Sequence, residues 1–297
     1  MPAMDNRFPE PDIALVRAIV AGQFPQWSGL EIRPVCVSGW DNRTFHLGDT
    51  LLVRLPSAAH YVAQVEKEQR WLPFLATELP LPIPKPIACG AASNLFPFPW
   101  SIYQWLPGET LSSSPDVNQL SFATSLAHFL RALQAISTTD APHPGPHCFY
   151  RGAHLNVYDV ETQQAFVTLV DDVDVSAASY VWNHALGSPY DEDPVWFHGD
   201  IAPGNLLIND GELCAVIDFG CCGVGDPACD VAIAWTDFEA DGRVSFLNQL
   251  GCDANMRSRA MGWALWKAMM TAVTCTKKGA PDWHRSMKTI QNVLDTA

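Results

Sequence analysis

Hydrophobic and polar positions follow two different periods along the chain, and each period dominates a different part of it. Short apolar runs of strand length, bounded by turn residues, dominate between residues 31 and 106. Within the first 106 residues, two stretches have the apolar spacing of a helix, Asp12–Ala21 and Tyr61–Leu75. Beyond residue 117, helical spacing extends over much longer stretches. The pattern predicts an α+β chain with a strand-rich N-terminal lobe and a mainly helical C-terminal lobe.

The strands expected in the N-terminal lobe are bounded by recognisable turn signals. They are Glu31–Val37, Thr44–Leu47, Leu51–Leu55 and Trp100–Leu106. Gly48-Asp49 predicts a hairpin between the second and the third of them. Proline at every second position from 80 to 86 predicts an extended segment, because proline cannot continue a helix.

The C-terminal lobe combines long helices with a small hairpin. The expected helices are Val117–Ile136, Phe166–Leu186, Ala260–Val273 and Trp283–Leu294. The expected short strands are Val195–His198, Leu206–Ile208 and Ala215–Ile217, and Asn209-Asp210-Gly211 is a strong hairpin signal between the last two. Pro107-Gly108 ends the preceding strand pattern, so we predict a first lobe over residues 1–106 and a second lobe over residues 107–297.

Composition narrows the class of protein. Of the 297 residues, 48% are hydrophobic and 17% are charged, which allows a large buried core. A net charge of −14 argues against a nucleic-acid partner. No apolar run approaches the roughly 20 residues that span a bilayer, and the first ten residues lack the apolar core of a signal peptide. With nine cysteines and no CxxC pair, we expect a cytoplasmic protein with free thiols and no membrane partner; the sequence predicts no oligomeric state.

The residues with the clearest chemistry lie in two short segments, His198–Asn205 and Ile217–Gly220, whose sequences are HGDIAPGN and IDFG. Phosphoryl transfer from ATP requires a carboxylate that orients the attacking hydroxyl and oxygen ligands that hold magnesium on the phosphates. Asp200 and Asn205 are five residues apart on a turn containing proline and glycine, and the expected hairpin returns Asp218 toward the same edge. We therefore interpret Asp200 as the catalytic base and Asn205 and Asp218 as Mg²⁺ ligands.

HGDxxxxN, followed by a hairpin and IDFG, resembles the aminoglycoside phosphotransferase family, which is related to the protein kinases. The resemblance extends over most of the chain and is loosest at residues 110–190. It implies a bilobal protein-kinase-like fold that uses ATP and Mg²⁺. It also implies that His198 and Asp230 are structural supports of the catalytic loop, with a proton shuttle as the alternative for His198.

The same resemblance implies nucleotide-binding positions in the first lobe. Ser38 and Asn42 lie between the first two strands, where the family has its phosphate loop, although an ordinary hairpin loop is the alternative. Arg54 on the third strand stands where protein kinases carry lysine, and its planar fork suits phosphate oxygens. A solvated surface arginine is the alternative for this position.

Two further positions follow from that comparison. Glu68 on the following helix is the preferred partner of Arg54, with Glu66 as the competitor on another face. Gln104 and Leu106 end the strand before the lobe boundary, where kinase-like folds offer main-chain groups to adenine.

The acceptor is expected to be a small molecule with a hydroxyl group, bound by the second lobe. Residues 151–253 contain 18 acidic and two basic residues, a formal charge of −16, which would attract a cationic acceptor such as an aminoglycoside. Nine of these acids are candidates for contacts with the acceptor: Asp171, Asp172, Asp174, Asp191, Glu192, Asp193, Asp237, Glu239 and Asp241. A solvated acidic face is the alternative for each cluster. The other acceptors that the resemblance allows are macrolides, choline, homoserine and similar alcohols, and a catalytically inactive nucleotide-binding module is the alternative from another class.

Overall fold

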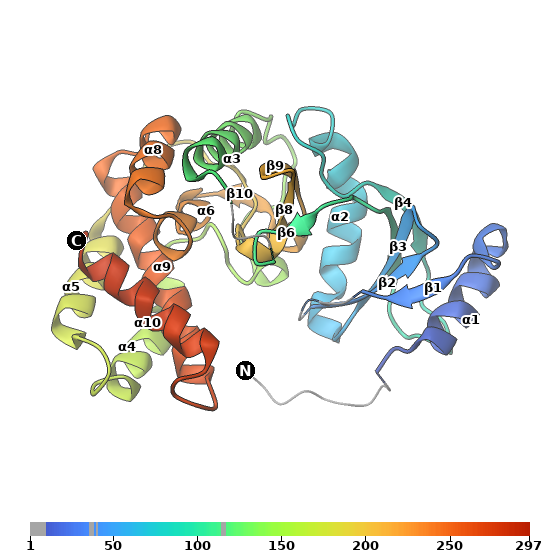
Figure 1. Ribbon diagram of the computed structural model, residues 1–297, viewed down its shortest axis with the longest axis horizontal. Coiled ribbons are helices and arrows are strands. Elements are labelled where there is room, and N and C mark those ends of the chain that lie inside the picture. The colour runs from blue at the N-terminus through green and yellow to red at the C-terminus, as the bar shows by residue number, and fades with distance from the viewer. Residues whose placement is uncertain (1–9, 36–38, 40, 114–116) are drawn as a thin grey trace. The chain divides into compact units, whose positions relative to one another are not determined.

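The computed structural model describes residues 10–35, 39, 41–113 and 117–297, and its contacts divide the chain into two compact units (Figure 1). The first comprises Met1–Gly108 together with Ala215–Gly220, and the second comprises Glu109–Cys214 and Cys221–Ala297. The first is built on an antiparallel sheet and the second is mainly helical, which confirms the predicted α+β class. The predicted division into domains at residue 107 stays a prediction.

The sheet of the first unit has five antiparallel strands in the order β1-β2-β3-β5-β4. The strands are β1 (Ile32–Pro34), β2 (Asn42–Leu47), β3 (Leu51–Pro56), β4 (Pro86–Gly90) and β5 (Trp100–Gln104). Gly48 has φ +61 in the β2–β3 hairpin, a left-handed conformation that glycine adopts without strain. The sequence analysis did not predict β4, which starts at a proline; its place at the sheet edge tolerates the missing N–H donor.

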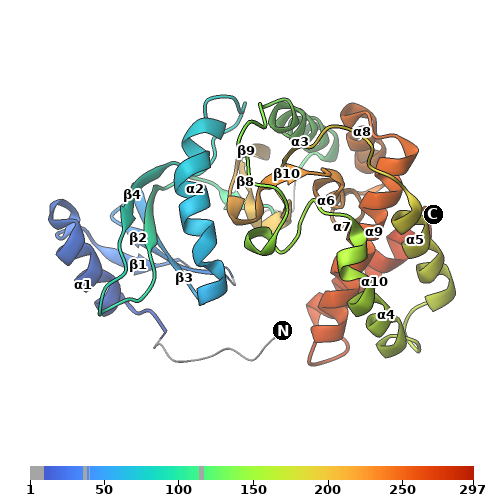
Figure 2. The ribbon, with the colours of Figure 1, turned by 180° about the vertical axis from the view of Figure 1, so that it is seen from behind.

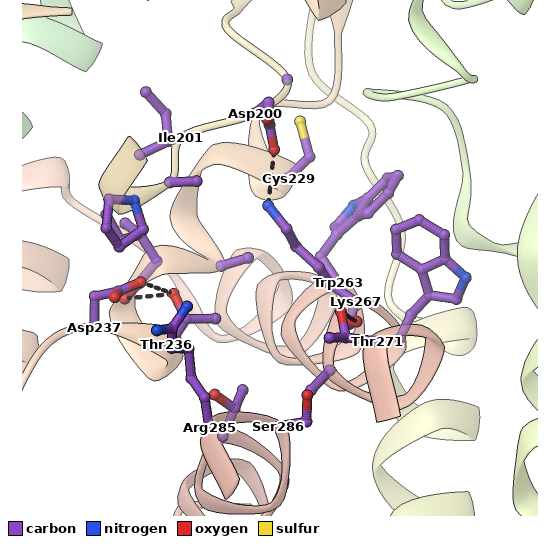
Figure 3. Close-up of a pocket in the computed structure, with 18 of the residues that line it drawn as sticks. Asp200, Ile201, Cys229, Thr236, Asp237, Trp263, Lys267, Thr271, Arg285 and Ser286 are labelled. Atoms are coloured by element: carbon purple, nitrogen blue, oxygen red, sulfur yellow. Dashed lines mark hydrogen bonds and ion pairs between the residues drawn. The ribbon is translucent and has the colours of Figure 1, made fainter. Parts of the chain in front are cut away.

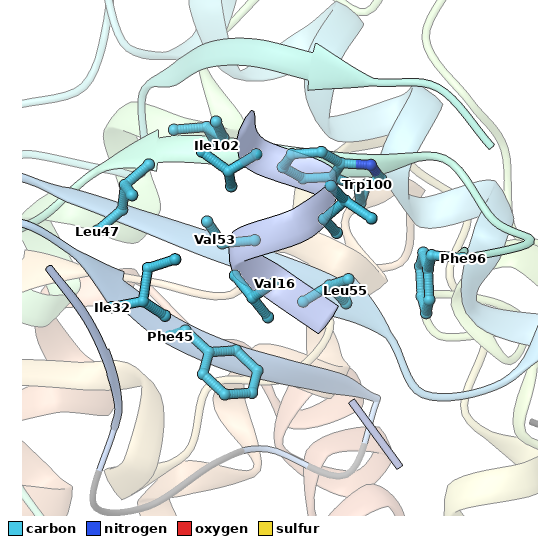
Figure 4. Close-up of a cluster of buried hydrophobic side chains, with 11 residues drawn as sticks. Val16, Ile32, Phe45, Leu47, Val53, Leu55, Phe96, Trp100 and Ile102 are labelled. Carbon is cyan, nitrogen blue, oxygen red and sulfur yellow. The ribbon is translucent and has the colours of Figure 1, made fainter. Parts of the chain in front are cut away.

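Two helices flank this sheet, α1 (Ile13–Gln23) and α2 (Val62–Leu75). Val16, Ile19 and Val20 of α1 pack with apolar side chains of the sheet in one buried cluster (Figure 4). Successive side chains of a strand point to opposite faces, so Val53 and Leu55 of β3 join this cluster while Arg54 points to the other side, toward α2. Both helices confirm predictions made from spacing, with ends shifted by no more than two residues.

Among the residues that the structure describes, the second unit is dominated by five long helices, which can be followed in Figure 2. They are α3 (Gln119–Gln134), α5 (Val175–Gly187), α8 (Ala240–Leu250), α9 (Ala254–Thr274) and α10 (Pro281–Leu294). Shorter helices are α4 (Asp159–Thr168), α6 (Ala228–Val231) and α7 (Ile233–Thr236). Helix α9 packs against α5, α6 and α10, and most of its side chains are buried.

The remaining strands are short. They are β6 (Glu109–Thr110), β7 (Val195–Phe197), β8 (Leu206–Asn209), β9 (Glu212–Val216) and β10 (Gly223–Gly225). Asp210 and Gly211 have φ +51 and +80 between β8 and β9, the two positive values of a type I′ hairpin turn. This turn confirms the hairpin predicted from Asn209-Asp210-Gly211.

One predicted helix, Phe166–Leu186, is wrong as a single element. The structure has α4 ending at Thr168, a turn, and α5 beginning at Val175. The Asp174 side chain accepts a hydrogen bond from the Ala177 N–H at 3.0 Å and so caps the start of α5. The apolar spacing of a helix continues across the turn between Thr168 and Val175, but the acidic residues of that turn, Asp174 among them, mark the start of a new helix.

Two predicted strands are shorter in the structure, since β1 ends at Pro34 and β5 at Gln104.

Within the described residues, no helix combines the length and the apolar character that crossing a membrane requires.

Candidate active site

The backbone of the segment His198–Asn205 is held by a buried carboxylate. Asp230, with no exposed surface, accepts the N–H of His198 through Oδ2 and the N–H of Gly199 through Oδ1, both at 2.7 Å. Gly199 has φ +85, and a Cβ atom there would lie 2.5 Å from the Cys221 carbonyl oxygen, so the turn requires glycine. The fully buried His198 accepts the Asp200 N–H at Nδ1, at 3.2 Å. Both residues predicted as supports of the loop therefore contact its backbone.

Asp200 is held at both carboxylate oxygens. Oδ1 accepts from Lys267 Nζ at 2.7 Å, and Oδ2 accepts from Asn205 Nδ2 at 3.0 Å. Burial alone would raise the pKa of Asp200, but the charge and hydrogen bond of Lys267, with Arg151 and His198, outweigh it and lower the pKa to about 2. Asp200 is therefore a fixed, ionised hydrogen-bond acceptor.

Asn205 is oriented by the same carboxylate. Its amide nitrogen donates to the Asp200 main-chain oxygen at 2.9 Å as well as to Oδ2. Because both bonds use the nitrogen, the amide oxygen points elsewhere and keeps its lone pairs for another ligand. A hard oxygen of this kind suits magnesium.

Asp218 belongs to the first unit, where it meets Arg54 and Glu68. Arg54 Nη2 lies 2.8 Å from Asp218 Oδ1, and Nη1 lies 3.2 and 3.3 Å from the Glu68 oxygens. The Tyr103 hydroxyl also donates to Glu68. Asp218 has φ +67, in the left-handed region that aspartate adopts more readily than most residues with a Cβ atom. The structure thus pairs Arg54 with Glu68, the partner preferred over Glu66.

A third carboxylate, Asp41, lies in the electrostatic environment of Arg54, Glu68 and Asp218. Its burial, and then the negative charge of Asp218, raise its pKa to about 6, although the charge of Arg54 opposes the rise. No role was predicted for Asp41, which directly precedes Asn42 in the sequence. A further missed contact is Lys67, which is buried and donates to the Gly220 carbonyl at 2.7 Å.

The other expected nucleotide-binding positions are less informative. Ser38 lies outside the described residues. Asn42 is buried on β2 opposite Pro56. The Gln104 N–H donates to the Lys85 carbonyl at 2.9 Å, so this group already belongs to the sheet, and Leu106 follows the end of β5.

A cavity of about 190 Å³ lies beside Asp200 within the second unit (Figure 3). Its walls come from the catalytic loop, from α6 and α7, and from the two C-terminal helices α9 and α10. The side chains of Trp263 and Trp266 give it an aromatic wall, and Trp266 Nε1 is anchored to Glu161 of α4 at 2.6 Å. The cavity therefore places a partly apolar surface next to the proposed base.

The charges around this cavity are balanced. The lining residues include three acids and three bases: Asp200, Asp237, Asp282, Arg151, Lys267 and Arg285. Among the residues that the structure describes, one of the nine acidic candidates, Asp237, lines the cavity. Others serve the fold, since Asp172 pairs with Lys278 at 2.6 Å and Asp174 caps α5.

Summing charge along the sequence could not reveal this balance. The basic stretch 254–297 supplies α9 and α10, whose Lys267 and Arg285 face the same cavity as acids from the preceding stretch. Lys267 carries no local sequence signal, because it is 67 residues from its partner Asp200. The described residues contain no cluster of three or more histidine, cysteine, aspartate or glutamate side chains suited to a metal ion.

Comparison with known proteins extends these observations. Residues 32–263 match the model of a family described as "Phosphotransferase enzyme family". An aminoglycoside 3'-phosphotransferase of Streptomyces fradiae is 27% identical over 170 residues, which cover 54% of this chain and 60% of that protein. One of Escherichia coli is 30% identical over 145 residues, covering 46% of this chain and 51% of that protein. These matches span only about half to three fifths of the curated relatives.

Solved structures share the fold over nearly the whole chain. The GDP complex of aminoglycoside 2'-phosphotransferase-IIIa superposes with a TM-score of 0.74 at 18% identity, covering 96% of this chain and 99% of that one. The macrolide 2'-phosphotransferase MphH from Brachybacterium faecium gives a TM-score of 0.62 at 18% identity, covering 94% and 97%. These likenesses confirm the predicted kinase-like fold. With a family match over most of its length and this fold, the chain belongs to the phosphotransferase enzyme family.

Proposed function

We propose that this protein transfers the γ-phosphoryl group of ATP to a hydroxyl group of a small molecule, with Mg²⁺ as the metal. The observation that carries the proposal is Asp200, a carboxylate fixed at both oxygens and exposed to a cavity lined by aromatic and charged side chains. Membership of the phosphotransferase family supports the same reaction. A catalytically inactive module would not need so closely held a carboxylate beside a cavity.

Asp200 orients the acceptor hydroxyl by accepting its hydrogen bond. A pKa of about 2 makes it a weak base, and this suits phosphoryl transfer, whose transition state is loose and requires little prior removal of the proton. The proton moves to Asp200 as the bond between the hydroxyl oxygen and the γ-phosphorus forms, while the bond from the γ-phosphorus to the bridging oxygen breaks and ADP leaves. Positioning and charge stabilisation then supply most of the rate enhancement.

Asn205 and Asp218 are the proposed magnesium ligands. The amide oxygen of Asn205 is directed away from Asp200 by the bonds of its nitrogen, and Asp218 offers a carboxylate, so the donor set fits a hard cation. When bound, the ion would neutralise phosphate charge. Arg54, braced by Glu68, is the proposed phosphate contact, and its present partner Asp218 shows that it can hold an anionic group.

Ser38 and Asn42 stay proposed contacts to the phosphates, and Gln104 and Leu106 stay proposed main-chain contacts to the base. The structural relatives solved with GDP and ADP support a purine nucleotide as the phosphoryl donor. Because ATP is supplied in the cytoplasm, that is the proposed compartment.

The first acceptor class to test is the aminoglycosides, because relatives of the chain are named for them and a solved relative was studied with kanamycin. Asp237, which lines the same cavity as the proposed base, is the candidate contact for a cationic group. The balanced charges of the cavity favour a second class, small neutral or zwitterionic alcohols, because Lys267 and Arg285 would repel a polycation.

A screen with radiolabelled ATP across aminoglycosides, macrolides and small amino alcohols tests the proposal, with Asp200→Ala as the matched variant. A general base typically contributes 10²–10⁴-fold, so we expect Asp200→Ala to lower kcat by about that factor while the affinity for ATP changes little. Near-normal transfer by this variant would refute the role of Asp200. ATP consumption that is independent of every acceptor would contradict the proposed activity.

A further inference from the structure

The ammonium group of Lys267 makes the closest contact with the Asp200 carboxylate, at 2.7 Å. Lys267 lies on α9 in the second unit, the same unit as the loop that carries Asp200. Its side chain and that of Asp200 keep 41% and 36% of their surface exposed, so both charged groups remain accessible from the cavity. Figure 3 shows Lys267 extending from α9 to Asp200 across this space.

The contact differs from an ordinary surface ion pair, which contributes little because two flexible side chains must be held in one geometry. Helix α9 is a rigid base for Lys267, because the preceding Trp263 and Trp266 are buried and Trp266 is anchored to Glu161. The backbone of a lysine on a firmly packed helix moves less than that of a lysine on a mobile loop, so the ammonium group is positioned more reproducibly.

The geometry also divides the carboxylate between two partners. A carboxylate accepts about four hydrogen bonds, two at each oxygen. Lys267 uses one site on Oδ1 and Asn205 uses one site on Oδ2, so the plane of the carboxylate is fixed and each oxygen keeps acceptor capacity for the substrate. Removing Lys267 would leave one oxygen without a fixed partner.

We propose that Lys267 is a positioning residue for phosphoryl transfer, which holds the Asp200 carboxylate in the orientation that receives the acceptor hydroxyl. This role rests on the proposed function. Arg151 is not an equivalent, because its guanidinium lies 4.5 Å from the Trp266 ring centroid and its Nη1 donates to the Tyr158 hydroxyl at 3.3 Å. Lys267 is thus the cation that makes a direct bond to Asp200 in the described structure.

The test is a double-mutant cycle of Lys267→Met and Asp200→Asn, with Lys267→Arg as the conservative variant. An error of about 1 Å in the placement of a reacting group can reduce the rate by about 10²-fold. We therefore expect Lys267→Met to lower kcat by about 10²-fold with little change in the KM for ATP, and Lys267→Arg to restore part of the loss. In the Asp200→Asn background, Lys267→Met should cost less than about threefold, because the charge that Lys267 holds is gone.

Lys267→Met and the exposed control Lys277→Met are compared by thermal unfolding and by single-turnover transfer from labelled ATP. A merely structural role predicts a lower unfolding temperature, an unchanged kcat for the folded fraction and equal effects in both Asp200 backgrounds, and this result would overturn the proposal. Equal 10²-fold losses in both backgrounds would show that Lys267 acts independently of Asp200, and would overturn it too. If the wild type transfers phosphate to no acceptor, the proposed function fails; wild-type transfer with full activity in Lys267→Met refutes only the role of Lys267.

Discussion

Replacing Asp230 with alanine should destabilise the second unit while leaving the surface of the molecule unchanged. The carboxylate has no exposed surface and accepts two main-chain N–H bonds at 2.7 Å, from His198 and Gly199. Hydrogen bonds to a charged group contribute about 1.5–3 kcal/mol each, so losing both removes about 3–6 kcal/mol. Burial raises the pKa of Asp230 even against these bonds, so removing the carboxylate also relieves part of its burial cost. The lower end, about 3 kcal/mol, is therefore expected.

Urea unfolding followed by far-ultraviolet circular dichroism measures this difference through the midpoint and its slope. A loss of 3 kcal/mol corresponds to a decrease in Tm of about 6–12 °C for a unit of this size. Asp230→Asn keeps one oxygen acceptor and should lose about half as much stability. The exposed Asp191→Ala is the control and should stay within about 0.5 kcal/mol of the wild type. If Asp230→Ala loses less than about 1 kcal/mol, these two hydrogen bonds do not hold the loop as argued.

Two further predictions concern the first unit. Asp218→Asn should weaken nucleotide binding in the presence of magnesium far more than in its absence, because a neutral amide is a poorer ligand for the ion. The measurement is a titration of both proteins with ATP, with and without magnesium. An unchanged magnesium dependence of the ATP affinity would exclude Asp218 as a ligand. Burial and the charge of Asp218 raise the pKa of Asp41 to about 6, so the folded protein binds the proton of this carboxyl group more tightly than the unfolded chain does. The free energy of unfolding should therefore decrease as the pH rises from about 4 to about 6. Asp41→Asn should remove that loss, measured as urea midpoints between pH 4 and 7 without magnesium, and identical pH profiles for the two proteins would contradict the assignment.

The sequence was sufficient where the interacting residues are neighbours in the chain. Asp200 and Asn205 lie on one short turn, so their spacing predicted that the two side chains would act together, and the structure joins them by a 3.0 Å hydrogen bond. The hairpin signal at Asp210-Gly211 was equally local, since it depends only on which residues tolerate positive φ.

Prediction failed where tertiary packing decides the outcome. Lys267 meets Asp200 because α9 packs beside the loop, and no periodicity encodes that contact. The negative charge expected at the acceptor site was obtained by summing charges over residues 151–253. That range leaves out α9 and α10, which contribute the basic residues Lys267 and Arg285 to the cavity wall. The helix predicted over Phe166–Leu186 failed for a different reason, because a capping aspartate interrupted a pattern whose apolar spacing continued.

The cavity beside Asp200 also has an evolutionary consequence. The proposed base lies on the loop of residues 199–203, while much of the remaining wall belongs to α9 and α10, which begin more than fifty residues later in the chain. The proposed base and the α10 part of the wall are therefore encoded in separate stretches, so a substitution in α10 changes the wall without changing the sequence of the loop. Helix α9 differs from α10 in this respect, because its Lys267 contacts Asp200 directly. Both an aminoglycoside phosphotransferase and a macrolide phosphotransferase are among the solved structures that share this fold.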